Sequence, residues 1–123
     1  MAGNQETISF SIANIPGDGI GKEVLPEGLR VLEKVASSFN IDFKTSDFPW
    51  SCQTYLNDGR MMPEDGIEQL RPHDAIFLGA VGYPGVPDHV SLWGLLIPIR
   101  RHFDQYVNLR PVRLLPGIEA PVK

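Results

Sequence analysis

The feature that most restricts the fold is a glycine-rich break, residues 16–21 (PGDGIG), between a strand-like and a helix-like segment. Before the break, residues 7–15 alternate in part and are rich in β-branched side chains, which favours a strand. After it, residues 22–39 carry apolar side chains at every third or fourth position, which predicts a helix with one buried face. That face consists of Leu25, Leu29, Leu32, Ala36 and Phe39.

The rest of the chain continues this alternation, so the sequence predicts an α/β fold with a mostly parallel sheet flanked by helices. A nearly continuous apolar run at residues 74–80 is typical of a strand buried on both faces. Pro98 is awkward inside the last predicted helix. The further strands are expected at residues 41–48, 74–80 and 106–115, and the further helices near residues 55–56, 63–70 and 91–103.

Two glycine-rich segments follow predicted strands, the break at residues 16–21 and a loop at residues 82–88. Ligands of parallel sheets bind beyond the carboxyl ends of the strands, so both segments are expected at one edge. The break at residues 16–21 matches neither of two known phosphate-binding loops, the dinucleotide fingerprint and the P-loop. The third glycine of a dinucleotide fingerprint is replaced by Lys22, and a P-loop would need a hydroxyl where Glu23 stands. A purely structural turn that requires positive φ is the alternative.

Composition and charge exclude several classes of function. The 123 residues have a net charge of −4 and a pI near 5.2, which argues against nucleic-acid binding. The sequence contains no long uncharged apolar run of the kind that spans a membrane. It also lacks a cationic stretch followed by an apolar one, as in a secretory signal. The single cysteine fits a reducing compartment such as the cytoplasm.

Basic residues gather late in the chain. Residues 1–99 carry six Lys or Arg and 13 Asp or Glu, whereas residues 100–123 carry five and two. Arg100 ends a predicted helix, and Arg110 precedes Pro111, which forces it into an extended conformation. Two guanidinium groups turned to one pocket could bind a dicarboxylate, each holding one carboxylate through two hydrogen bonds. The alternative is a pair of unrelated surface arginines.

Three motifs, in this order, resemble a known family. They are residues 15–24 (IPGDGIGKEV), residues 79–82 (GAVG) and residues 100–111, which end in Asn108-Leu109-Arg110-Pro111. Together they are similar to the pyridine-nucleotide-dependent β-decarboxylating dehydrogenases, the isocitrate and isopropylmalate dehydrogenase family. Residues 86–94 (VPDHVSLWG) and 103–108 (FDQYVN) are most similar to its tartrate and D-malate dehydrogenase branch.

The resemblance implies an isopropylmalate dehydrogenase-like fold and oxidative decarboxylation of a small 2-hydroxydicarboxylate, such as D-malate to pyruvate and carbon dioxide, or oxidation of tartrate. It implies NAD, Mg²⁺ or Mn²⁺, and a monovalent cation such as K⁺ as cofactors. It places no catalytic residue and no metal ligand within this chain, because the family's acid–base tyrosine and lysine and its metal-binding aspartates correspond to positions beyond residue 123.

The same resemblance assigns site residues. Arg100 and Arg110 correspond to arginines that bind the substrate carboxylates, and Ser91 and Trp93 lie where the family contacts the variable substituent of the substrate. A bulky Trp93 leaves room only for hydrogen or hydroxyl at C3; ordinary core packing of this side chain is the alternative. The residues implied in cofactor binding are Gly82, Tyr83, Pro84, Asp88, His89, Gly17 and Asp18. We expect Asp18 to brace its turn rather than to act in catalysis.

The resemblance also divides the chain. Residues 1–105 would form the N-terminal part of the large cofactor-side domain, and residues 106–123 the first strand entering a second, smaller domain. We therefore expect an N-terminal piece that is inactive alone, from a cytoplasmic, homodimeric enzyme that binds neither nucleic acid nor membranes. A non-catalytic fragment that binds a nucleotide or pairs with another subunit is the alternative.

Overall fold

The computed structural model describes residues 7–122 and contains a three-stranded parallel sheet in the order β2-β1-β3. The strands are β1 (Ile8–Gly17), β2 (Ile41–Asp47) and β3 (Ala75–Ala80). The central strand β1 pairs with β2 through residues 8–14 and with β3 through residues 12–17, with Ile12 opposite both Thr45 and Ala75. The predicted α/β fold with a parallel sheet is confirmed.

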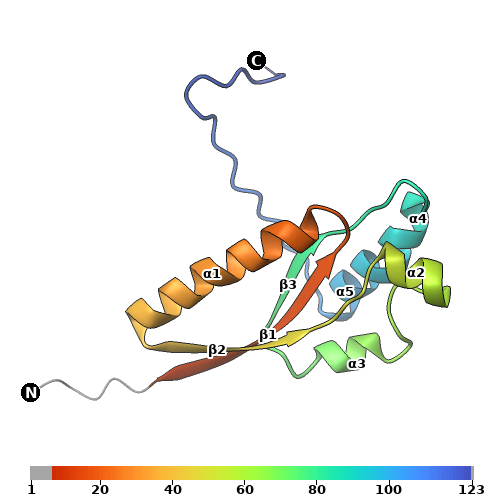
Figure 1. Ribbon diagram of the computed structural model, residues 1–123, viewed down its shortest axis with the longest axis horizontal. Coiled ribbons are helices and arrows are strands. Elements are labelled where there is room, and N and C mark those ends of the chain that lie inside the picture. The colour runs from red at the N-terminus through yellow and green to blue at the C-terminus, as the bar shows by residue number, and fades with distance from the viewer. Residues whose placement is uncertain (1–6, 123) are drawn as a thin grey trace, which may run out of the picture.

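Helices lie on both sides of this sheet (Figure 1). The long helix α1 (Gly21–Phe39) packs across all three strands, and the shorter helices gather on the opposite side. There Ala13 and Ile15 of β1 form a core with Trp50, Met61, Leu70, Leu95 and Ile99. The shorter elements are α2 (Cys52–Asp58), α3 (Gly66–Leu70), α4 (Asp88–Ser91), the π-helical turn η1 (Leu92–Leu96) and α5 (Ile97–His102).

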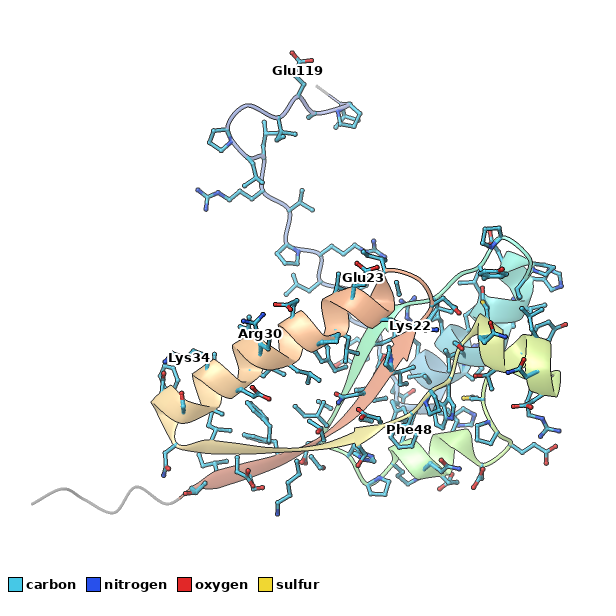
Figure 2. All side chains as sticks on the ribbon, in the orientation of Figure 1. Lys22, Glu23, Arg30, Lys34, Phe48 and Glu119 are labelled. Carbon is cyan, nitrogen blue, oxygen red and sulfur yellow. The ribbon has the colours of Figure 1, made fainter. Side chains whose placement is uncertain are left out.

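The amphipathic face predicted for α1 is confirmed at its first turns and wrong at its end. Leu25 is buried, whereas Phe39 is 70% exposed because the chain reverses at Asn40, in the left-handed region, and resumes as β2 at Ile41. On the outer side of α1, Glu23 and Arg30 point away from the sheet (Figure 2). No helix in residues 7–122 combines the length and apolarity that crossing a membrane requires.

Three other sequence predictions need correction. β3 is half-buried rather than buried on both faces, because it is an edge strand among the described residues. The helix expected from Pro63 begins only at Gly66, after a turn closed by the Gly66 N–H to the Pro63 carbonyl. Residues 106–115 form no strand: they run away from the folded body without a neighbouring strand to pair with (Figure 1).

Two aspartates fix the pairing of β1 with β3 at its two ends. At the amino end, the Asp74 carboxylate accepts hydrogen bonds from the Ser11 backbone N–H (2.7 Å) and hydroxyl (3.0 Å), which lower the pKa of Asp74. At the carboxyl end, the Asp18 N–H donates to the Ala80 carbonyl at 2.6 Å. Ligands of parallel sheets bind at the carboxyl ends of the strands, so Asp18, rather than Asp74, lies where a ligand site is expected.

The buried Asp18 carboxylate joins three segments that are distant in sequence. Its Oδ2 accepts the backbone N–H of Cys52, at the start of α2, and that of Gly82, just after β3, each at 3.1 Å. The Cys52 thiol is buried, and this burial, together with the hydrogen bond and negative charge of Asp18, raises the pKa of Cys52 to about 11. The Asp18 side chain thus braces its turn as expected, but it does so by tying the turn to two other segments rather than through bonds within the turn.

Gly21 is required where α1 starts against the ends of β1 and β3. A Cβ added at Gly21 would overlap the Pro16 carbonyl oxygen and press on the Ala80 nitrogen, and neither backbone atom can move without disturbing the sheet. We predict that Gly21→Ala destabilises the protein by at least about 2 kcal/mol. The measurement is the urea unfolding midpoint. Gly59→Ala is the control: the site is open and only its φ of +74° is strained, at a cost of about 1 kcal/mol. Equal midpoints for Gly21→Ala and the parent protein would contradict the close approach.

Cys52 makes stability depend on alkaline pH. Its pKa is about 11 in the folded protein and 9.0 ordinarily, so the folded state keeps its proton while the unfolded state loses it. The contribution is complete below pH 9 and disappears as the pH rises to 11, for a total of about 3 kcal/mol. We predict that unfolding free energies measured from pH 8 to 11 fall more steeply for the parent protein than for Cys52→Ala. Parallel slopes would show that burial and Asp18 do not raise the pKa of the Cys52 thiol in the folded protein.

Candidate functional site

The two glycine-rich segments meet at the carboxyl edge of the sheet, as predicted. Asp18 bonds to both the last residue of β3 and the first loop residue after Val81, through Ala80 and Gly82. A Cβ on Gly17, whose φ is +72°, would overlap the Ala80 carbonyl oxygen, so the two segments touch at their backbones. Gly17 and Asp18 therefore lie under the loop rather than on its outer surface.

The loop after β3 is a tight turn with a buried anchor. Val86 is 4% exposed, and its N–H donates to the Tyr83 carbonyl at 2.9 Å, which closes the turn. The side chains of Tyr83, Pro84, Asp88 and His89 are all exposed. These four of the predicted cofactor-binding residues thus form one exposed surface with an aromatic ring, an acid and an imidazole. The backbone of the loop is held from its buried side by the bond between Asp18 and the Gly82 N–H.

A continuous helical segment, α4-η1-α5, carries the predicted substrate residues. Ser91 is buried, and its hydroxyl donates to the Asp88 carbonyl at 3.1 Å. Trp93 is 57% exposed, so the alternative that its indole belongs to the core is excluded. The structure therefore turns Ser91 inward and Trp93 outward, as expected for two residues that lie two positions apart on a helix and so on nearly opposite faces.

The predicted pair of arginines is not brought together in this structure. Arg100, in the last turn of α5, lines an open hollow of about 440 Å³ with Asp104, Gln105 and Tyr106. Arg110 lies on the extended segment beyond and donates to the Asn108 side chain at 3.4 Å. The physical reason is that no strand within residues 7–122 pairs with the segment after residue 105, so no sheet pairing folds Arg110 back toward α5.

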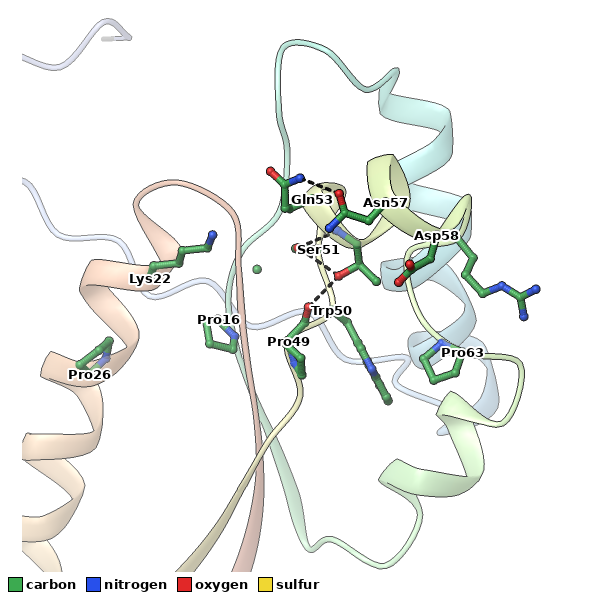
Figure 3. Close-up of a pocket in the computed structure, with 13 residues that line it drawn as sticks. Pro16, Lys22, Pro26, Pro49, Trp50, Ser51, Gln53, Asn57, Asp58 and Pro63 are labelled. Atoms are coloured by element: carbon green, nitrogen blue, oxygen red, sulfur yellow. Dashed lines mark hydrogen bonds between the residues drawn. The ribbon is translucent and has the colours of Figure 1, made fainter.

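A second cavity was not anticipated from the sequence. It measures about 730 Å³ and lies between the start of α1 and α2 (Figure 3). Lys22 projects toward it from one wall, while Ser51 and Gln53 stand on the other. The Thr54 N–H donates to the Ser51 hydroxyl, so a serine three residues before a threonine, at a helix start, is the signal that could have located this wall.

The uncharged polar side chains of this second cavity are engaged with each other or with the backbone. The Gln53 amide donates to Asn57, and the Thr54 hydroxyl donates to the Pro49 carbonyl at 2.7 Å. Prolines 16, 26, 49 and 63 supply much of the remaining lining. Gly17 is the one predicted site residue that lines this cavity, so the cavity is distinct from the exposed surface of the loop after β3 and from α5.

The described residues offer no metal centre: within residues 7–122 no three His, Cys, Asp or Glu side chains come together to hold an ion. The metal that the resemblance implies does not fit this part of the chain. What the residues can do is bind anions through Arg100 at a helix end and present a fixed, exposed loop beside the carboxyl ends of β1 and β3.

Comparison with known proteins places these features in a family. The model of the isocitrate/isopropylmalate dehydrogenase family matches residues 11–123. Tartrate dehydrogenase/decarboxylase of Pseudomonas putida is 60% identical over 112 residues, which are 89% of this chain and 31% of that protein. D-malate dehydrogenase [decarboxylating] of Escherichia coli strain K12 is 58% identical over 116 residues, 93% of this chain and 32% of that protein. The chain thus spans about a third of the length of these curated relatives.

A solved structure shares the fold. The apo crystal structure of a β-decarboxylating dehydrogenase from Thermococcus kodakarensis matches 79% of this chain and 27% of its own, with a TM-score of 0.58 and 28% identity. Sequence motifs, parallel sheet and structural neighbour therefore agree. The family model alone covers nearly all of the described residues. This chain belongs to the isocitrate/isopropylmalate dehydrogenase family.

Proposed function

We propose that this chain is part of an NAD-dependent enzyme that acts on a small 2-hydroxydicarboxylate, by oxidative decarboxylation of D-malate, by oxidation of tartrate, or by both. The observation that carries the proposal is the 58–60% identity to relatives named for those two substrates, over about nine-tenths of this chain. With D-malate, the C2 hydroxyl is oxidised to a ketone by hydride transfer to NAD⁺. The carboxylate β to the ketone then leaves as carbon dioxide, so that the products are pyruvate, carbon dioxide and NADH.

Each residue has a role in this proposal. Arg100 holds one substrate carboxylate from the end of α5, where its guanidinium is exposed at the rim of a hollow. Arg110 holds the second carboxylate, which requires the segment after residue 105 to turn back toward α5. Because both groups are cations on opposite sides of one dianion, they orient the hydroxyl-bearing carbon rather than take part in proton transfer.

The loop of residues 82–89 forms one wall for the nicotinamide half of the cofactor. NAD supplies the hydride acceptor when it is bound. Tyr83, Pro84 and His89 present exposed side chains there, and the Asp18 bond to the Gly82 N–H keeps the loop backbone in place. Asp18 and Gly17 support this loop from its buried side, since Asp18 is buried and its carboxylate is already hydrogen-bonded.

Ser91 and Trp93 set the space around C3 of the substrate. Ser91 fixes the first turn of the helical segment through its bond to the Asp88 carbonyl. The exposed indole of Trp93 fills the volume that a larger C3 substituent would need. Hydrogen or hydroxyl at C3 fits beside such a ring, which favours malate or tartrate over isocitrate or isopropylmalate.

The oligomeric state, cellular location and metal ions that we propose are those of the family. We propose that the complete enzyme is a homodimer of the cytoplasm that uses Mg²⁺ or Mn²⁺, together with a monovalent cation such as K⁺. In support, the one cysteine of the chain is a buried free thiol, as in proteins of reducing compartments. The metal ligands would come from other parts of the polypeptide or its partner, and the roles given above to this chain's residues do not involve the metal.

The test of the function is an assay of the complete gene product that contains this chain. We expect NAD-dependent oxidation of D-malate with release of carbon dioxide, or NAD-dependent oxidation of tartrate, and far slower turnover of isocitrate and isopropylmalate. The 123 residues expressed alone should be inactive, because no catalytic residue is assigned to them. A preference for isocitrate would overturn the proposal, and NAD binding without turnover of any of the four acids would favour the non-catalytic alternative.

Arg100→Lys tests the proposed carboxylate contact. Lysine keeps the charge but loses the paired hydrogen bonds of guanidinium, so kcat/KM for D-malate should fall by about 100-fold. The KM for NAD should stay unchanged, because Arg100 touches only the substrate in this proposal. The matched control is Arg113→Lys, at an exposed position of the extended segment, which should behave as the parent enzyme. An equal loss in both variants would remove Arg100 from the substrate site.

A further inference from the structure

Trp93 has a charged partner that no motif indicated. The guanidinium carbon of Arg101 lies over the Trp93 ring, 5.2 Å from the ring centroid. This distance is within the range of a cation–π interaction, for which arginine over tryptophan is a favourable pair. Among residues 7–122, Arg101 has no carboxylate within ion-pair distance, so its charge is directed to the indole alone.

The π-helical turn η1 explains why Arg101, rather than Arg100, reaches Trp93. In a regular α-helix, residues seven apart share a face, and that partner would be Arg100. Within η1 the Ile97 N–H bonds back five residues to the Leu92 carbonyl, which inserts one extra residue into the turn. The residue that shares the face of Trp93 is thereby moved to the eighth position, which is Arg101.

Pro98 accounts for the position of this turn. Proline has no N–H and its ring collides with the carbonyl four residues earlier, here that of Gly94. Widening the turn at residues 92–96 removes that conflict and allows α5 to start with Pro98 in its first turn. The same phase shift rotates Arg100 by about 100° from the face of Trp93. Arg100 instead faces the side where Ile76, Leu78 and Leu96 line a small cavity.

We propose that Arg101 is a positioning residue that holds the indole of Trp93 in place and so sets the limit on the C3 substituent of the substrate. This rests on the proposed function. Trp93 is more than half exposed, so packing alone leaves its rotamer weakly fixed. A cation stacked on the ring restricts it to one orientation. The two adjacent arginines thus have different roles: Arg100 binds the substrate carboxylate, and Arg101 positions the indole wall beside it.

The experiment uses the complete gene product and a double-mutant cycle of Arg101→Gln with Trp93→Leu. Arg101→Gln should raise kcat/KM for isopropylmalate relative to D-malate by about threefold, since an exposed cation–π contact has about that effect on an equilibrium. Arg101→Lys keeps a cation and should restore most of the parent ratio. In the Trp93→Leu background, Arg101→Gln should leave the ratio unchanged, because the ring that it holds is gone.

Thermal unfolding of the same four proteins provides a readout without substrate. Coupling between the two substitutions is expected there, and Arg113→Gln is the control that should show none with Trp93→Leu. Absence of coupling would overturn the contact. An equal change for both substrates, or a shift that persists without Trp93, would overturn the specificity role. Coupling in an enzyme that oxidises none of the dicarboxylates would instead refute the proposed function, and the specificity role with it.

Discussion

The arrangement of the site depends on one buried carboxylate. Asp18 belongs to the first turn of the chain, yet its bonds reach residues 34 and 64 positions away, at Cys52 and Gly82. Each of these backbone N–H groups lies at the beginning of a segment, where a helix or strand offers it no regular hydrogen-bond acceptor. A single anion in a buried place therefore sets the relative positions of the turn after β1, the start of α2 and the loop after β3.

A second constraint acts at the end of the folded part. Pro98 cannot continue a regular helix, and the π turn that accommodates it changes which side chains share a face. As a result, Arg101 rather than Arg100 shares the face of the exposed Trp93, an arrangement that a regular helical wheel would assign wrongly. The chemistry of residues 88–102 is set as much by this phase shift as by the identity of the residues.

Much of the fold could be predicted from local patterns. The β-branched run before the glycine break, the apolar spacing of α1 and the apolar run of β3 each gave the correct element, because strand and helix periodicity depend on near neighbours. The expectations that failed depend on distant contacts. Phe39 is exposed, β3 is only half-buried and residues 106–115 form no strand, and in each case the presence or absence of another element beside the residue decides.

The sequence by itself determined the parallel α/β architecture, the meeting of the two glycine-rich segments and, through its motifs, the family. These follow from backbone sterics and side-chain periodicity, which act over a few residues. Only the tertiary structure decided that the carboxylate of Asp18 is shared between two other segments, that Trp93 faces outward and that Arg101 lies over it. Such contacts join residues through space, and the helix phase that creates the last of them arises from the cost of packing Pro98 into a regular turn.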